Sequence, residues 1–122
     1  MIIRDLEECT EFTAGDKTIL RELLHADKTE KASFRYSLAH ATVRQGEQSK
    51  PHALRTSEVY YILEGQGEMH IGDEAAPVRS GQAIVIPPKA TQYIRNIGSG
   101  DLKFLCIVDP AWKISDESVF PL

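Results

Sequence analysis

From residue 34 onward, the sequence is a series of short runs rich in β-branched and aromatic residues, each closed by turn-forming residues. Turn signals at such close and regular spacing favour an all-β sandwich or barrel. No ten-residue helical stripe separates the runs, so a fold built from parallel βαβ units is disfavoured. The runs that we expect to form strands are 34–43, 58–63, 68–71, 83–86, 92–95 and 102–108.

The two ends of the chain lie outside this pattern. Residues 16–26 place three leucines at a helical spacing behind Asp16, a candidate N-cap, but the same residues also suit an extended edge strand. Residues 115–118 are expected to form one helical turn with Ser115 as its cap. The N-terminal third therefore keeps two alternatives, and the C-terminus is expected to be a short helical turn.

Length and composition bound the organisation of the chain. With 122 residues, of which 42% are hydrophobic and 26% charged, it suits one domain with a single core. We divide it into an N-terminal extension over 1–33 that packs on the barrel, a barrel core over 34–110 and a tail over 111–122. All three parts are expected to belong to one domain.

Charge and apolar run length exclude several classes of protein. Fourteen Lys and Arg against eighteen Asp and Glu give a net charge of −4 with no basic run, which disfavours nucleic-acid binding. The start is acidic where a secretory signal needs apolar residues, and the apolar runs are too short to span a membrane. Cys9 and Cys106 are expected to be reduced thiols. We therefore expect a cytoplasmic protein with no nucleic-acid or membrane partner.

Two groups of residues recur at fixed intervals. In the first, Gly46 is followed after five residues by His52, then by Glu58 and by Gly65. The glycines of this group, like Gly81 further on, stand where tight turns between strands need a positive φ. The interval therefore predicts that the histidine and the glutamate lie on strands bounded by tight turns.

The second group begins at Gly81 and continues through Pro87 and Gln92 to Asn96. Pro87 begins a Pro-Pro pair that marks the end of a strand, because proline cannot continue a hydrogen-bonded ladder. Gln92 and Asn96 share one face of the strand that follows. This group therefore predicts a second strand with polar side chains on one face.

The polar residues of the two groups converge if their strands are neighbours in a barrel. His52, Glu58 and Gln92 would then bring an imidazole, a carboxylate and an amide together inside it. A histidine and a carboxylate can bind a divalent metal, and the amide oxygen is a weaker, neutral ligand. Tyr60 shares the face of Glu58 and is expected to line the same pocket. The candidate ligand-binding residues are thus His52, Glu58, Tyr60 and Gln92, and the candidate metal ligands are His52, Glu58 and Gln92.

These intervals resemble the two motifs of the cupin superfamily. The first motif is a glycine, five residues, His-x-His, three or four residues, a glutamate, six residues and a glycine. The second is a glycine, five residues, Pro-x-Gly, two residues, a histidine, three residues and an asparagine. The resemblance extends over about residues 34–110 and implies a single small barrel of jelly-roll type, also called a double-stranded β-helix. It also implies a homodimer with a pocket at one mouth of the barrel.

The chain departs from these motifs at three positions. Leu54 stands at the second histidine, Lys89 at the glycine of Pro-x-Gly, and Gln92 at the last histidine. In metal-binding cupins, two histidines and the glutamate of the first motif and the histidine of the second hold the ion. Of the four metal-ligand positions that the resemblance implies, this chain keeps two, His52 and Glu58. One divalent ion, Mn, Fe, Ni or Zn, remains an open possibility for the site.

The other histidines and the tryptophan are expected away from the site. The geometry of cupins favours the small residues of 37–43 facing inward, which places His40 outside; the alternative is that His40 replaces a lost ligand. His25 and His70 are expected at the surface. Trp112 is expected to fill a gap or a dimer contact rather than to stack on a ligand.

Three functions remain open from the sequence. The first is a small-molecule binding protein that uses the barrel as a container. The second is a metal-dependent cupin enzyme, a dioxygenase, isomerase or decarboxylase. The third is a metal-free isomerase or epimerase in which Glu58 orients His52 as the general base. The loss of ligands at Leu54 and Gln92 favours the first.

Overall fold

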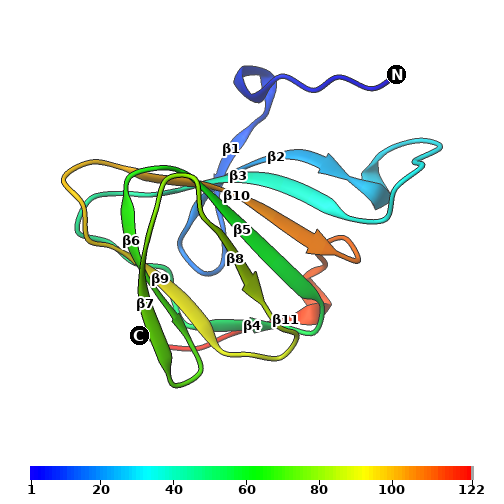
Figure 1. Cartoon of the computed structure of the whole chain (residues 1–122). Helices are drawn as coiled ribbons and strands as arrows, with labels where there is room; N and C mark the ends of the chain where they lie inside the picture. Colours follow the sequence, from blue (N-terminus) through cyan, green and yellow to red (C-terminus); the bar gives the residue numbers. More distant parts are fainter. Residues whose placement is uncertain (122) are drawn as a thin grey trace.

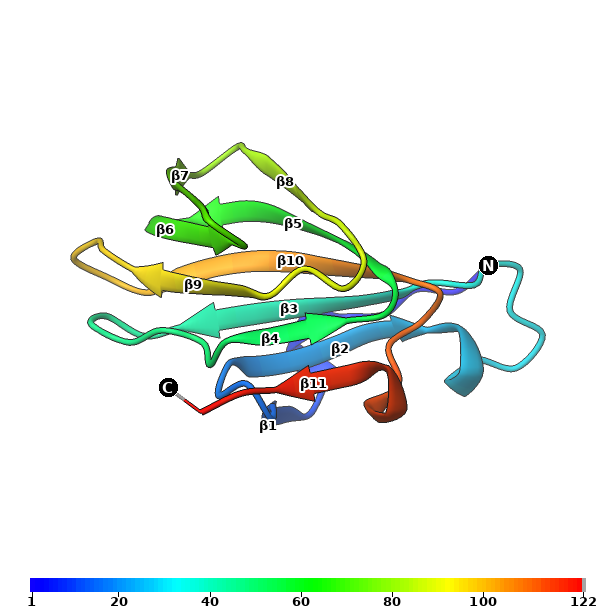
Figure 2. The same cartoon turned by 90° about the horizontal axis from the view of Figure 1, so that it is seen from below.

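The short apolar runs form eleven strands, arranged as two antiparallel sheets, in the computed structural model, which describes residues 1–121 (Figures 1 and 2). The all-β jelly-roll prediction is therefore confirmed. The first sheet has the order β1 (Glu11–Thr13), β2 (Ile19–His25), β3 (Ser37–Val43), β10 (Leu102–Asp109), β5 (Ser57–Glu64) and β8 (Ala83–Ile86).

The second sheet has five strands and closes the other side of the barrel. Its order is β11 (Glu117–Val119), β4 (His52–Leu54), β9 (Gln92–Asn96), β6 (Gln66–Ile71) and β7 (Glu74–Arg79). Three short 3-10 helices complete the described structure, and none of them is long and apolar enough to cross a membrane: η1 (Leu6–Glu8), η2 (Ala26–Lys28) and η3 (Ile114–Asp116).

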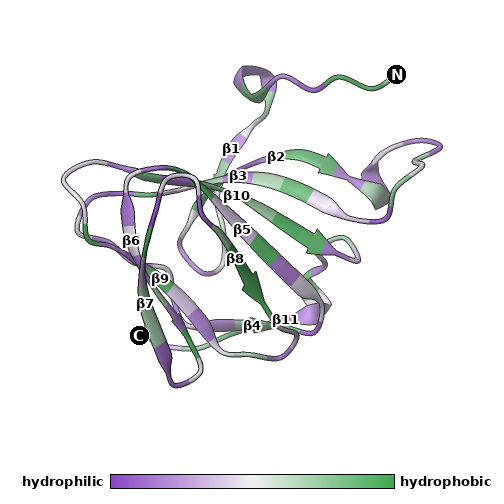
Figure 3. Ribbon diagram, in the orientation of Figure 1, coloured by the Kyte–Doolittle hydropathy of each residue, from purple (hydrophilic) through white to green (hydrophobic). Residues whose placement is uncertain are grey.

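The core lies between the two sheets, where alternate side chains of the strands point inward. Tyr60 and Phe104, from neighbouring strands, belong to this core and place their ring centroids 4.4 Å apart. The hydropathy of the ribbon is highest along β8 and β10 (Figure 3). Burial of the inward-facing side chains removes apolar surface from water and stabilises the barrel. The buried core comprises Ala41, Val43, Tyr60, Ile62, Met69, Ile86, Ile94, Leu102 and Phe104.

Tight turns occur at the predicted glycines. Gly46, Gly65 and Gly81 all have positive φ, at 77°, 87° and 89°. At Gly65, a Cβ would also lie 2.6 Å from the carbonyl oxygen of Asp101, so the turn has no room for a side chain. Lys89, which replaces the glycine of the second motif, keeps the left-handed conformation with φ of 69°.

The N-terminal third takes the extended alternative rather than the helix. Residues 19–25 form β2, which pairs with β3, and the register shifts between Glu22 and Leu24. Leu20 pairs with Ala41 on the inner face, whereas Leu24 pairs with Leu38 directly after the shift. The extra residue at this shift explains why a strand carries leucines at a helix-like spacing. β1 and β2 thereby extend the six-stranded sheet.

The C-terminal prediction is correct in its turn and wrong in its cap. A 3-10 turn forms over Ile114–Asp116, but Lys113 is its first flanking residue and no side chain caps it, so Ser115 lies within the turn. The chain then continues as β11, which pairs with β4. Pairing with β4 satisfies backbone groups that a longer helix would have satisfied internally.

Candidate functional site

A cavity of about 290 Å³ lies inside the barrel, between the inner face of the six-stranded sheet and the strands β4 and β11. Polar side chains from both sheets and from the loop before β2 line it, together with aromatic and aliphatic residues. Three of the predicted site residues, His52, Glu58 and Tyr60, are among the lining residues. The full lining is Phe12, Thr13, Ala14, Gly15, Asp16, Thr18, Leu20, Glu22, Lys28, Ser37, Ala39, His52, Leu54, Glu58, Tyr60, Phe104, Cys106, Val108, Trp112 and Glu117.

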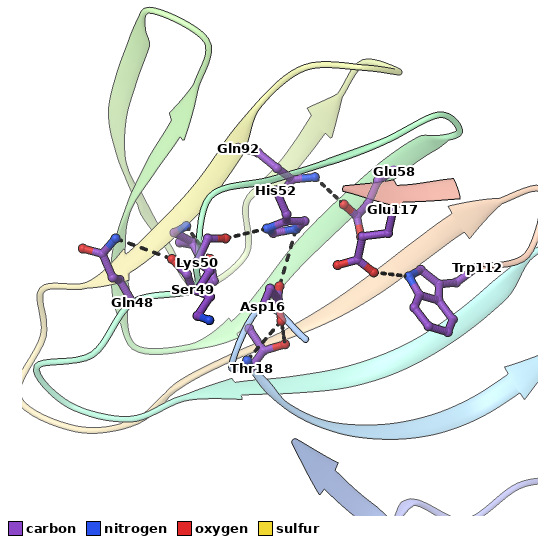
Figure 4. A network of polar contacts seen from close by, with 11 residues as sticks. Asp16, Thr18, Gln48, Ser49, Lys50, His52, Glu58, Gln92, Trp112 and Glu117 are labelled. Atoms are coloured by element: carbon purple, nitrogen blue, oxygen red, sulfur yellow. Dashed lines mark hydrogen bonds and ion pairs between the residues drawn. The ribbon is translucent and has the colours of Figure 1, made fainter. Parts of the chain in front are cut away.

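His52 stands on β4 with 3% of its surface exposed. Its Nδ1 lies 2.8 Å from the backbone oxygen of Lys50. Because a carbonyl can only accept a hydrogen bond, Nδ1 carries the proton and Nε2 is the free nitrogen of the neutral ring. That Nε2 lies 3.5 Å from Oδ2 of Asp16 (Figure 4). The backbone thus fixes both the tautomer and the direction of the reactive nitrogen.

Asp16 is a member of the site that sequence reasoning missed. Its Oδ1 accepts hydrogen bonds from the backbone nitrogen and the hydroxyl of Thr18, at 3.1 and 2.7 Å (Figure 4). Its backbone oxygen accepts from the nitrogen of Lys50 at 2.7 Å. These bonds leave Oδ2 directed at His52. The Asp-x-Thr spacing signals the local turn, but no sequence signal places it beside a strand far along the chain.

Glu58 and Gln92 form a buried pair next to His52. Nε2 of Gln92 donates to Oε1 of Glu58 at 2.6 Å, and Gln92 is the ladder partner of His52 (Figure 4). Burial raises the pKa of Glu58 to about 7, opposed by the Gln92 hydrogen bond and by His52 and reinforced by Asp16. Near neutral pH this carboxyl group can therefore either hold or release a proton.

Gln92 itself does not line the cavity. It is 1% exposed and lies behind Glu58, and its Oε1 has no hydrogen-bond partner among the residues that the structure describes. The structure thus places Gln92 as a support for the carboxylate rather than as a group that reaches the cavity.

Glu117 and Trp112 form another polar pair on the cavity wall. The indole Nε1 donates to Oε2 of Glu117 at 2.7 Å (Figure 4). Burial raises the pKa of Glu117, and the indole hydrogen bond opposes the rise. Trp112 therefore lines the cavity, whereas the sequence predicts that it fills a gap or a dimer contact. Neither residue carries a motif signal, since β11 lies outside both motifs.

The tyrosine and the cysteine of the cavity wall stay protonated near neutral pH. Burial raises the pKa of Tyr60 and that of Cys106 well above their ordinary values. Cys106 is accordingly an inert thiol. Tyr60 is 2% exposed and faces the cavity as predicted, whereas Tyr61 faces outward.

The other histidines lie away from this cavity. His40 lines a depression on the outer side of the barrel, as the inward-facing small residues of β3 predict. His25 was expected at the surface, but it is 5% exposed, because its Nε2 donates to the backbone oxygen of Trp112 at 2.7 Å. His70 is half-buried, stacked on Tyr93.

The donor set around His52 does not fit a metal centre. Within residues 1–121, no three His, Cys, Asp or Glu side chains are arranged to hold an ion. Leu54 occupies the second histidine position and offers no donor. Gln92 turns its NH₂ group toward Glu58, and a carboxylate that accepts this bond leaves the amide oxygen directed elsewhere.

Comparison with known proteins decides the family. The family model described as a cupin domain matches residues 39–108. The chain belongs to the cupin family. It is 37% identical over 120 residues to the uncharacterized protein MJ1618 of Methanocaldococcus jannaschii, covering 98% of this cupin and 94% of the relative.

Two further relatives carry names that mention a small molecule. An oxalate-binding protein of Thermotoga maritima is 33% identical over 51 residues, 42% of each chain. The structure of Pac13, a nucleoside dehydratase of Streptomyces, has a TM-score of 0.76 and 20% identity, covering all of this cupin and 92% of Pac13. At this identity, the second likeness shows the shared barrel fold alone.

Proposed function

We propose that this cupin binds a small polar molecule in the barrel cavity and exchanges a proton with it through His52 and Glu58, without a bound metal ion. The observation that carries the proposal is that a free imidazole nitrogen and a buried carboxyl group border one cavity of about 290 Å³. Cavities of this size, with a few convergent polar groups and a perturbed pKa, are typical of ligand sites.

The burial of these groups supports a functional role. An ionisable side chain inside a small barrel costs stability that an apolar residue would supply. Glu58 has a single hydrogen-bonding neighbour, Gln92, and Oδ2 of Asp16, unlike its Oδ1, has no closer partner than His52 at 3.5 Å. Such incompletely satisfied polar groups favour a ligand as the missing partner.

The roles of the two residues follow from their partners. Nε2 of His52 is the base, because the Lys50 carbonyl keeps the proton of the neutral ring on Nδ1. The carboxylate of Asp16 would stabilise the imidazolium formed when Nε2 takes a proton. Glu58, with a pKa of about 7, is the group that gives a proton or takes one at neutral pH. An isomerase, epimerase or elimination reaction on a small molecule needs this pair of functions.

The named relatives agree with a small polar ligand. One is described as binding oxalate and the other as dehydrating a nucleoside. The likeness to Pac13 shows the barrel fold alone, and the partial likeness to the oxalate-binding protein supports only a small molecule inside the barrel. The cytoplasmic location and the lack of a nucleic-acid partner stay predictions.

The proposal is tested with a defined panel of sugars, nucleosides, amines and dicarboxylates by thermal unfolding. We expect at least one compound to raise the unfolding midpoint of the wild type and to lose that effect in His52→Ala. His70→Ala, at a half-buried position on β6, is the matched control and should keep the effect. If no compound acts, or if His52→Ala responds like the wild type, the proposal is contradicted.

We also propose that the chain forms a homodimer through the outer face of the six-stranded sheet. Tyr61, Leu63, Val85 and Ile107 are all more than a third exposed on its strands β5, β8 and β10. Apolar side chains gathered on one face are typical of an interaction surface. Light scattering during gel filtration should give a molar mass twice that of one chain. The Val85→Lys variant should give the molar mass of a single chain.

A further inference from the structure

The cavity is acidic at its polar end. Asp16, Glu58 and Glu117 line it, and Lys28 is the one Lys or Arg among the lining residues within residues 1–121. That lysine is 65% exposed and its Nζ lies 2.8 Å from Oε1 of Glu22, so its charge is matched outside the polar end. The polar end thus has three carboxyl groups and no permanent cation.

The hydrogen bonds to these carboxyl groups come from neutral donors. Thr18 donates to Asp16, Gln92 to Glu58 and the indole of Trp112 to Glu117. Neutral donors stabilise a carboxylate without cancelling its charge. His52, at 3.5 Å from Asp16, is the one group that can become positive among them. Once Glu58 and Glu117 are ionised, one imidazole cannot balance three carboxylates, and the polar end then carries an excess of negative charge.

Two oxygens of this cluster have no donor in the described part of the chain. Glu58 is 6% exposed and accepts from Gln92 through Oε1 alone, which leaves Oε2 free. Glu117 accepts from Trp112 through Oε2, which leaves Oε1 free. Neither oxygen is among the fully enclosed polar atoms without a partner in the described residues, so both reach the space of the cavity. Figure 4 shows both carboxyl groups beside His52 and across from Asp16. A ligand that brings N–H donors would satisfy these oxygens.

The rest of the cavity wall is apolar and partly aromatic. Leu20, Phe104 and Val108 line it together with the rings of Tyr60 and Trp112. Such a wall favours a ligand whose body is apolar, and aromatic faces attract a positively charged group through their ring quadrupoles. The two halves of the cavity therefore favour opposite ends of one molecule.

We propose that the ligand of this cavity is a small organic cation, an amine or a protonated nitrogen heterocycle, with its charged nitrogen between Glu58 and Glu117 and its apolar body against Trp112. This inference rests on the proposed function, because it names the class of molecule that the same cavity holds. An ammonium group donates charge-assisted hydrogen bonds to the free oxygens. A carboxylate or phosphate ligand would lose its hydration beside three acidic groups with no cation to receive it.

The test compares three probes of the same shape at pH 7.5 by isothermal titration calorimetry. Benzylamine is protonated at this pH, benzyl alcohol is its neutral counterpart, and benzoate is its anionic counterpart. We expect benzylamine to bind about tenfold more tightly than benzyl alcohol, the effect of one charge-assisted hydrogen bond, and benzoate to bind more weakly than either. Glu117→Gln should reduce the preference for benzylamine at least about threefold, whereas Glu74→Gln, exposed on β7, should leave it unchanged.

The outcomes separate this inference from the proposed function. Benzoate or benzyl alcohol binding as tightly as benzylamine would overturn the cation inference, while binding that His52→Ala abolishes would leave the proposed function standing. If none of the probes binds, the cation inference is also overturned, and the proposed function is then decided by the thermal panel alone. A preference for benzylamine that Glu117→Gln leaves intact would overturn the position assigned to the charged nitrogen.

Discussion

Burial of Glu58 lowers the stability of the fold and also brings the pKa of this residue close to neutral pH. Its carboxyl group is buried in the barrel next to Asp16 and His52, and one amide hydrogen bond from Gln92 compensates only part of the lost hydration. The folded-state pKa of about 7 lies above the ordinary value of 4.5. The native state therefore binds the Glu58 proton more tightly than the unfolded state does, and stability is coupled to pH.

The coupling has a definite sign. Between about pH 4.5 and 7 the native state holds the proton that the unfolded state has released, so the free energy of unfolding falls as pH rises. The loss from this one group is about 3 kcal/mol. We expect urea unfolding of Glu58→Gln to show a shallower pH dependence over this window and a higher stability than the wild type at pH 8.

The control for that experiment is Glu74→Gln, on the exposed face of β7. It should keep the wild-type dependence on pH. The account of Glu58 fails if the wild type gains stability from pH 5 to pH 7, or if Glu58→Gln has the same slope as the wild type.

Leu54 and Gln92 are the two residues that remove metal ligands from the site. Both are buried, and Leu54 lines the cavity where cupins that bind metal carry a second histidine. We expect the wild type, incubated with Mn, Fe(II), Ni or Zn and then desalted, to retain less than stoichiometric metal. The double variant Leu54→His and Gln92→His should retain about one ion per chain, because it restores the four-ligand set that the resemblance implies.

Elemental analysis measures the metal retained by the wild type and by the double variant. The single variant Leu54→His is the intermediate control. One ion per wild-type chain, lost in His52→Ala, would contradict the metal-free account and favour the metal-dependent alternative with His52, Glu58 and Gln92 as ligands. The readout does not depend on any catalytic activity.

At the scale of elements, the site depends on where β4 is held. β4 pairs with β11 on one side and with β9 on the other, which brings Glu117, His52 and Gln92 into one neighbourhood. The loop before β2 adds Asp16, tied to the chain ahead of β4 by the bond from Lys50. A three-residue strand thus positions the histidine because both of its edges are paired.

Two glycines in the turns between strands differ in how much room they leave for a side chain. Gly65 has φ of 87° and would place a Cβ 2.6 Å from the backbone oxygen of Asp101, whereas Gly72 has φ of 56° and open space. Gly72→Ala should cost about 1 kcal/mol of unfolding free energy from its backbone conformation alone. Gly65→Ala should cost at least about 2 kcal/mol, since backbone must also move. Equal costs in chemical denaturation would show that the close approach at Gly65 has no effect.

At the scale of the whole molecule, the sequence predicts the barrel and part of its site. The runs between turn residues become strands, and the motif intervals place His52, Glu58 and Tyr60 on the cavity wall. These predictions succeed because strand alternation and turn chemistry are local properties.

The remainder of the site depends on contacts between distant parts of the chain. Asp16 and Glu117 reach the cavity through pairing of β2 with β3 and of β11 with β4, which no local pattern encodes. The register shift near Leu24 likewise gives a strand the leucine spacing of a helix. His25 is buried for the same reason, since its partner is the backbone of Trp112. Tertiary pairing, rather than propensity, decides these positions.

Trp112 offers the most direct measurement of the central claim, that a small molecule binds inside the barrel. It is the single tryptophan of the chain, it lines the cavity, and its indole N–H donates to Glu117. The chain therefore gives one indole N–H signal in a nitrogen-15 NMR spectrum. Compounds from the panel that raise the unfolding midpoint should shift this signal saturably in the wild type and leave it unmoved in His52→Ala. Binding that leaves the Trp112 signal in place, and instead shifts residues around His40 on the outer side, would contradict the account.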